Sequence, residues 1–225
     1  MQDGLHELGV TPADRDLARL ERLLRLLDKW NRAFNLTAVR DLEEMVARHI
    51  LDSLSVRPFL YGSSVLDVGT GAGFPGLPLA ILEPERRFCL LDSGGKKVRF
   101  VRHAVAELQI DNVAVIQARV EKYAPEELFD TVMCRAFASI GKFVGLCGGL
   151  AGAGGRLLAM KGRFPDDELG SLLSVRRSFL RGQPPWEATQ IASVRIPGLA
   201  VQRHIVVIER RETEPCESKR EGHDG

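Results

Sequence analysis

The stretch DVGTGAGFPG, residues 67–76, decides the fold of this chain. It follows the apolar run SVLDV, which is typical of a buried strand, and it leads into a predicted helix. Glycines at such a turn let backbone N–H groups and the helix N-terminus come close to an anionic group. The stretch therefore predicts a loop that binds a nucleotide-like cofactor.

Two cofactors fit this loop. From Gly71 onward, GAGFPG matches the G-x-G-x-x-G of dinucleotide-binding folds, whereas from Asp67 onward, DVGTGAG matches the loop of S-adenosylmethionine (SAM) methyltransferases. Asp67 favours SAM, because a carboxylate there repels a pyrophosphate and attracts a positively charged aminoacyl end. Asp92 closes the next predicted strand and suits the ribose hydroxyls of either cofactor, so it does not choose between them.

The order of the elements extends this prediction. The runs SVLDV, RFCLLD, VAVIQ, FDTVMC and RLLAM read as strands that alternate with helical stretches such as 94–109 and 139–150, which indicates a parallel sheet covered on both faces. The last two runs, TQIASVRIP and HIVVIERR, are joined by a link too short for a crossover helix and predict an antiparallel hairpin. We therefore expect an α/β fold of the class I SAM-dependent methyltransferase type: a Rossmann-like, mostly parallel seven-stranded sheet that ends in an antiparallel hairpin.

Residues 1–60 are expected to form an N-terminal helical extension. Thr11, Pro12 and Asp14 make a helix start, and the helix is expected to run to about Phe34. One side of it carries apolar residues and the other carries basic ones: Arg15, Arg19, Arg22, Arg25, Lys29 and Arg32. This basic stripe is either a solvated face, the interpretation we favour, or a surface that tracks phosphates.

A second helix is expected from the capping pattern Asp41-x-x-Glu44. Residues 61–210 are expected to form the SAM-binding methyltransferase domain. The polar residues 211–225 are expected to be a disordered tail.

Composition sets outer limits. The 225 residues allow one substantial core, and 31 basic against 30 acidic residues give a net charge of +1, so a nucleic-acid partner must be met by a local patch. The four cysteines, Cys89, Cys134, Cys147 and Cys216, have no metal-ligand spacing, which predicts a reducing compartment and no metal site. No run approaches the roughly 18 apolar residues of a membrane span, and the protein is expected to be cytoplasmic, with no membrane contact.

Seven motifs carry a resemblance to a known family. In order and at about the family's spacing stand FNLTAVRD, RHILDSL, VLDVGTGAGFPGLPLA, LLDSGGKKVRFV, ARVE, CRAF and LLAMKG. Over roughly residues 15–210 the chain resembles the bacterial 16S rRNA guanine-N7 methyltransferases, also called glucose-inhibited division protein B. The resemblance implies a cytoplasmic monomer that uses SAM to methylate N7 of one guanine in 16S rRNA near the decoding centre. The substrate is then the 30S subunit or an assembly intermediate, and loss of the methyl group is associated with low-level streptomycin resistance.

The resemblance also assigns residues. It implies that Gly69 and Phe74 contact SAM, that Val120 and Glu121 border the adenine, and that Arg135 reaches the methionine or the substrate. With the loop analysis, the predicted cofactor-binding residues are Asp67, Gly69, Gly71, Gly73, Phe74, Asp92, Val120, Glu121 and Arg135. Their place at the carboxyl edge of the sheet, and not the resemblance, makes Lys96, Lys97, Arg99 and Lys161 RNA-binding candidates, with solvated helix charges and a strand-end turn as the alternative. Phe74, Phe137 and Arg135 are expected near the guanine. Gly94-Gly95 and Cys134 depart from the family pattern.

Guanine N7 has a lone pair and no proton, so its methylation needs no general base, and no catalytic residue is predicted beyond a contact from Arg135. Cys134 is either a nucleophile or, as we favour, a small buried thiol. His49 and Asp52 lie three residues apart and are either a metal or acid–base pair or, as we favour, a polar contact between the extension and the sheet.

Two other functions stay open from the residues alone. One is a nicotinamide-dependent oxidoreductase, which Asp67 and the terminal hairpin disfavour. The other is a non-catalytic RNA-binding protein built on a methyltransferase fold.

Overall fold

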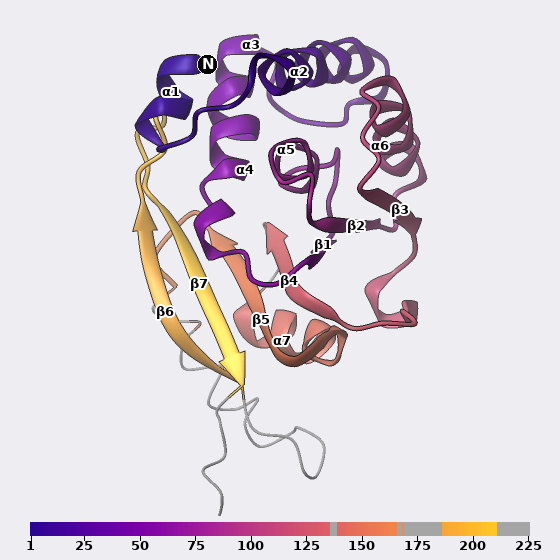
Figure 1. The fold of residues 1–225 in the computed structure, drawn as a ribbon, viewed down its shortest axis with the longest axis vertical. Helices are drawn as coiled ribbons and strands as arrows, with labels where there is room; N and C mark the ends of the chain where they lie inside the picture. The colour runs from indigo at the N-terminus through magenta and orange to yellow at the C-terminus, as the bar shows by residue number, and fades with distance from the viewer. Residues whose placement is uncertain (136–138, 166–167, 169–185, 211–225) are drawn as a thin grey trace, which may run out of the picture.

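One seven-stranded sheet forms the centre of the part of the chain that the computed structural model describes, residues 1–135, 139–165, 168 and 186–210 (Figure 1). Its strands stand in the order β3-β2-β1-β4-β5-β7-β6. They are β1 (Ser64–Val68), β2 (Arg87–Asp92), β3 (Val113–Gln117), β4 (Phe129–Arg135), β5 (Ala151–Lys161), β6 (Trp186–Val194) and β7 (Arg203–Arg210).

Strands β1 to β5 pair in parallel, whereas β7 pairs antiparallel with β5 and with β6. The predicted fold class is confirmed, including the antiparallel hairpin at the end. The chain order reverses at β1, which has β2 on one side and β4 on the other, and open α/β sheets bind ligands at such a switch point. The predicted tail 211–225, which contains Cys216, and Phe137 lie outside the described residues.

Helices cover both faces of the sheet (Figure 1). The N-terminal helices are α1 (Gln2–Glu7), α2 (Asp14–Phe34), α3 (Leu42–Met45), the π-helical turn η1 (Val46–Leu51), α4 (Asp52–Leu54) and the 3-10 turn η2 (Arg57–Phe59). The remaining helices and turns are α5 (Gly76–Leu82), α6 (Gly95–Glu107), η3 (Val120–Lys122), α7 (Ile140–Cys147) and η4 (Gly148–Leu150).

Alternation along the strands builds two cores. Phe88 and Leu90 of β2 pack into a cluster with α1, α2, α5 and α6, whereas Cys89 and Leu91 pack into a second cluster with α7. Successive side chains of a strand point to opposite faces, so one buried strand contributes to both clusters. Because Leu20, Leu23 and Leu27 of α2 belong to the first cluster, the N-terminal helices share a core with the sheet.

The basic stripe of α2 is largely paired. Arg22 contacts Glu107, Arg19 donates to the backbone oxygen of Gln109 at 2.9 Å, and Arg25 and Arg32 each contact an acidic residue one turn earlier. These contacts support the solvated-face interpretation. The helix starts at Asp14 after an N-cap at Ala13 that makes no side-chain hydrogen bond, so Thr11 does not cap it.

The second predicted helix begins as expected but does not continue as a regular α-helix. Asp41 caps α3 by accepting a hydrogen bond from the Glu44 N–H at 2.8 Å. From Val46 to Leu51 the chain is π-helical, a feature that apolar spacing does not reveal. Such bulges recur at functional sites, and this one carries His49.

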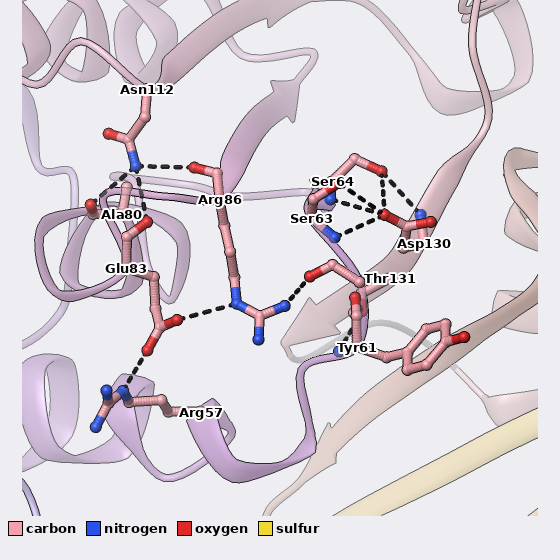
Figure 2. Close-up of polar contacts among 11 residues, drawn as sticks. Arg57, Tyr61, Ser63, Ser64, Ala80, Glu83, Arg86, Asn112, Asp130 and Thr131 are labelled. Atoms are coloured by element: carbon pink, nitrogen blue, oxygen red, sulfur yellow. Dashed lines mark hydrogen bonds and ion pairs between the residues drawn. The ribbon is translucent and has the colours of Figure 1, made fainter.

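A polar network fixes the amino-terminal edge of the sheet (Figure 2). The Asp130 carboxylate accepts hydrogen bonds from the backbone N–H groups of Ser63 and Ser64 at 2.8 and 2.9 Å, and Thr131 exchanges two hydrogen bonds with the backbone of Tyr61. A Cβ on Gly62 would lie 2.2 Å from the Asp130 Cβ, so only glycine fits beside this carboxylate. The network ties the segment that enters β1 to the start of β4.

We expect Asp130→Ala to lower the free energy of unfolding by about 1–3 kcal/mol, because two backbone N–H groups lose their acceptor. Burial raises the pKa of Asp130, but the hydrogen bonds from Ser63 and Ser64 outweigh it, so the pKa lies below its usual 3.8. The stabilisation is therefore present above pH 3.8 and lost as pH falls through the lowered pKa.

Urea unfolding at pH 7 measures the loss, with Asp111→Ala as the control because the Asp111 side chain is exposed. Equal unfolding free energies for the two variants would contradict the assignment.

Candidate functional site

The glycine loop between β1 and α5 folds back onto the end of β2. The backbone oxygen of Leu91 accepts hydrogen bonds from the N–H groups of Gly69 and Thr70, at 2.8 and 3.1 Å. Gly69 and Gly71 have φ values of +70° and +63°, which glycine adopts without steric cost. The third loop glycine, Gly73, allows close packing, since a Cβ there would lie 2.4 Å from Leu77.

Two carboxylates brace the loop from below. Asp67 is fully buried, and its Oδ2 accepts hydrogen bonds from the Thr70 hydroxyl at 2.7 Å and from the Gly76 N–H at 2.9 Å. Asp92 accepts from the N–H groups of Gly71 at 2.9 Å and Gly94 at 2.7 Å. Burial raises the pKa of Asp67 to about 6. Its Oδ1 is buried and has no hydrogen-bond partner among the described residues.

Three cavities lie in a row along the carboxyl ends of the strands. The first, of about 290 Å³, is lined by Gly69, Asp92, Val120 and Glu121 together with neighbours on β1, β2 and the segment after β3. The second, of about 180 Å³, is lined by Gly69, Gly71, Phe74, Arg135 and residues of the N-terminal extension. The third, of about 380 Å³, lies at the ends of β4 and β5 beside η1.

Shared residues join these cavities. Gly69 lines both the first and the second, whereas His49 and Arg135 line both the second and the third. A molecule that fills the first two cavities therefore ends beside His49 and Arg135, next to the third.

The N-terminal extension supplies one wall of the second cavity. Asn31 holds the loop after α2 by donating to the Val39 oxygen at 3.0 Å and accepting from the Thr37 N–H at 2.9 Å. The Thr37 hydroxyl lies 3.0 Å from His49 Nε2, and the His49 ring stacks on Phe74 with ring centres 4.8 Å apart. Burial, and then the charge of Arg135, lower the pKa of His49 to about 4. The ring is therefore neutral at physiological pH.

Asp52 connects the extension to two distant strands. Its Oδ2 lies 3.2 Å from Arg135 NH1 at the end of β4, and its Oδ1 lies 2.9 Å from Arg203 Nε at the start of β7. Arg135 also donates to the backbone oxygen of Arg48 at 3.0 Å. The favoured interpretation of Asp52, a polar contact between the extension and the sheet, is confirmed.

The structure brings most of the predicted cofactor residues together. Gly69, Gly71, Phe74, Asp92, Val120, Glu121 and Arg135 line the first two cavities. Asp67 and Gly73 shape the loop without lining a cavity, and direct contact of Asp67 with a cofactor stays a prediction.

The RNA-binding candidates separate into two groups. Lys97 lines the second cavity, 4.0 Å from the Asp92 carboxylate, whereas Lys96 and Arg99 lie on α6 outside the three cavities. Lys161 lines the third cavity and contacts Glu168 at 2.7 Å.

Several lining residues were missed. The loop residues Leu36 and Thr37 line the second cavity, and Val39, Arg48 and Arg203 line the third. Four of these five lie inside the motifs FNLTAVRD and RHILDSL, so the motifs marked the region without indicating what it does. Nothing in the sequence indicated Arg203 as a site residue, since it is a single basic residue at the start of a strand.

Cys134 is 2% exposed and packs in the core under α7. This burial supports the small-thiol interpretation and disfavours a nucleophile.

The fold and this site define a class I SAM-dependent methyltransferase. Among solved structures, the chain resembles the glycopeptide N-methyltransferase MtfA in complex with S-adenosyl-L-homocysteine, with a TM-score of 0.60 over 72% of this chain and 87% of that one, at 11% identity. It also resembles TYW2 of P. horikoshii in complex with MeSAdo, with a TM-score of 0.52 over 65% of this chain and 56% of that one, at 12% identity. At such low identities the likeness shows the fold alone.

Sequence relatives identify the family. Residues 16–178 match the family model GidB, described as rRNA small subunit methyltransferase G. The chain is 43% identical to ribosomal RNA small subunit methyltransferase G of Marinobacter nauticus, over 94% of either chain. It is 47% identical to the protein of the same name from Idiomarina loihiensis, over 92% of this chain and 96% of that one. The chain belongs to the rRNA small subunit methyltransferase G family.

No helix in the described part of the chain is both long and apolar enough to span a membrane.

Gly71→Asp tests the cofactor loop. Apart from its chain neighbours, a Cβ at this position would meet only the Gly69 oxygen, at 4.0 Å, so a side chain can be added there without a clash and takes up room at the wall of the second cavity. Its carboxylate would also lie near Asp92. We expect SAM affinity to fall at least about 100-fold by calorimetry, a loss of roughly 2.7 kcal/mol.

Gly9→Asp is the matched control, because Gly9 has a similar φ of +70° and open space but lies at the end of α1. Retained SAM affinity in Gly71→Asp would overturn the loop assignment.

His49→Gln tests the burial of a neutral imidazole. A lowered folded-state pKa means that the unfolded chain binds more protons between pH 6.5 and about 4, so the wild-type protein loses stability as pH falls through that window. We expect the variant to lack this loss. Its free energy of unfolding should change with pH less steeply than that of the wild type, by up to about 1.4 kcal/mol per pH unit. Urea unfolding across this pH range measures the slope, with exposed His6→Gln as control. Identical slopes in His49→Gln and the wild type would refute the interpretation.

Proposed function

We propose that this protein transfers a methyl group from SAM to N7 of one guanine in 16S rRNA. The observation that carries the proposal is the row of three cavities, in which His49 and Arg135 line both the second and the third. The family supports rRNA as the substrate, since the relatives in Marinobacter nauticus and Idiomarina loihiensis are named for it.

The residues present fit SAM. Gly69 has no atom within 4 Å of where a Cβ would stand, so its backbone is open to a ligand. Asp92 offers carboxylate oxygens to ribose hydroxyls in the first cavity. The unpartnered Asp67 Oδ1 adds negative charge beneath the loop, which favours a cationic ligand. When bound, SAM supplies an electrophilic methyl group on a positively charged sulfur.

The residues of the chain act by placement. Phe74, which lines the second cavity, stacks on His49, which lines the second and the third, and Arg135 lies 6.0 Å from the centre of the Phe74 ring. Because guanine N7 carries no proton, none of these groups needs to accept one. Neutral His49 also adds no positive charge beside a base that becomes cationic.

Further features follow from the same proposal. The proposal takes the protein to act as a monomer, as its resemblance to the family implies. A net charge of +1 gives little general attraction to RNA, which supports a structured target, the 30S subunit or a late assembly intermediate. Such a substrate places the protein in the cytoplasm. The hairpin and the family disfavour the nicotinamide alternative.

The test is transfer of labelled methyl from SAM to 30S subunits from a strain that lacks the modification. The modified base is mapped by strand cleavage at 7-methylguanine. We expect label at a single guanine N7, and none on subunits from a strain that already carries the modification.

The Gly71→Asp variant serves as the inactive control. Transfer to free 16S rRNA but not to 30S subunits would assign an assembly intermediate as the substrate. No transfer to either, with RNA binding retained, would favour the non-catalytic alternative.

A further inference from the structure

In the third cavity, two arginines share one carboxylate. Its charged lining residues are Arg48, Asp52, Arg135, Lys161 and Arg203. Arg48 contacts Glu44 at 2.6 Å and Lys161 contacts Glu168 at 2.7 Å, whereas Arg135 and Arg203 share Asp52 alone. The Asp52 carboxylate therefore faces two guanidinium groups, and this group of three side chains carries one net positive charge.

Asp52 holds the two arginines in fixed places. Its side chain is 6% exposed, and each of its oxygens contacts a different arginine. Arg203 uses Nε for this contact, so its two terminal amino groups have no hydrogen-bond partner among the described residues. Arg203 NH1 lies 3.7 Å from the position that a Cβ would take on Gly162, which also lines the cavity.

A guanidinium in this arrangement suits one of two ligands on RNA. It can form a forked pair with a phosphate, or it can read N7 and O6 of a guanine. The proposed reaction excludes the contact with N7 and O6, because a hydrogen-bond donor on N7 would occupy the lone pair that must attack the methyl group. A cation against the imidazole ring would also oppose the positive charge that forms there.

We propose that Arg203, positioned by Asp52, binds a backbone phosphate at the target guanosine and so sets the base in the third cavity. This inference rests on the proposed function. It assigns a substrate contact to a residue on β7, the strand farthest along the described chain. Because Arg203 lines only the third cavity, it contacts RNA and not the cofactor.

Binding of 30S subunits without SAM tests the contact directly. The dissociation constant is measured at several KCl concentrations for the wild type, Arg203→Ala and Arg203→Lys. We expect Arg203→Ala to weaken binding about 10-fold or more and to reduce the slope of log Kd against log salt by nearly one, the value of one lost phosphate contact. Arg203→Lys keeps the charge but not the fork, so it should restore the slope and only part of the affinity.

Two controls distinguish a lost RNA contact from misfolding and from weaker SAM binding. Arg87→Ala removes an exposed arginine at the amino end of β2, where it should leave binding unchanged. SAM affinity by calorimetry should stay within about two-fold in Arg203→Ala, which also reports that the variant folds.

The variant Asp52→Asn distinguishes the positions of Arg135 and Arg203 from their charges. It keeps both cations, so the salt slope should not fall. Release of Arg135 and Arg203 should nevertheless lower kcat at least about 10-fold and weaken SAM binding through Arg135.

The outcomes are distinct. An unchanged salt slope in Arg203→Ala, or a loss of SAM affinity equal to the loss of RNA affinity, would overturn the phosphate assignment. Wild-type protein that binds 30S subunits but transfers no methyl would refute the proposed function and leave the binding comparison intact.

Discussion

The site depends on one constraint: the glycine loop must lie against the end of β2. The Leu91 oxygen accepts two N–H groups of the loop, and the carboxylates of Asp92 and Asp67 accept from Gly71 and Gly76. Four backbone N–H groups are thereby committed before any ligand arrives. The loop is thus preorganised by the two strands at which the sheet order reverses, and the first two cavities open along it.

The N-terminal extension completes a site that the sheet alone leaves unfinished. Asn31 and Thr37 fix the loop after α2, and the π-helical turn places His49 over Phe74. Asp52 then fastens this turn to β4 and β7. Since these helices also share the first apolar cluster with the sheet, shifting the extension would disturb both the core and the shared wall of the second and third cavities.

Local patterns allowed the sequence to predict the strands, the hairpin and the cofactor loop. The contacts of the glycine loop are made by Asp67, the loop glycines and Asp92, which are close in the chain or lie on adjacent strands. Their spacing in the sequence was therefore enough to predict the loop. The substrate side was not predictable in this way, because Asp52, Arg135 and Arg203 meet only after β4 and β7 have joined the sheet. For the same reason periodicity did not reveal the partners of the stripe on α2, since Arg22 contacts Glu107 at the end of α6.

Charge explains why such a site can work without a proton acceptor. In the proposed reaction, methylation of N7 makes the base a cation as the sulfonium loses its charge, so one positive charge moves from the second cavity to the third. That movement is opposed by the charge left over on Arg135 and Arg203, and would be opposed further by a protonated His49. An RNA phosphate on Arg203 cancels the excess. The target then brings its own counter-charge, and N7 gains its positive charge beside a group in which Asp52, Arg135, Arg203 and the phosphate sum to zero.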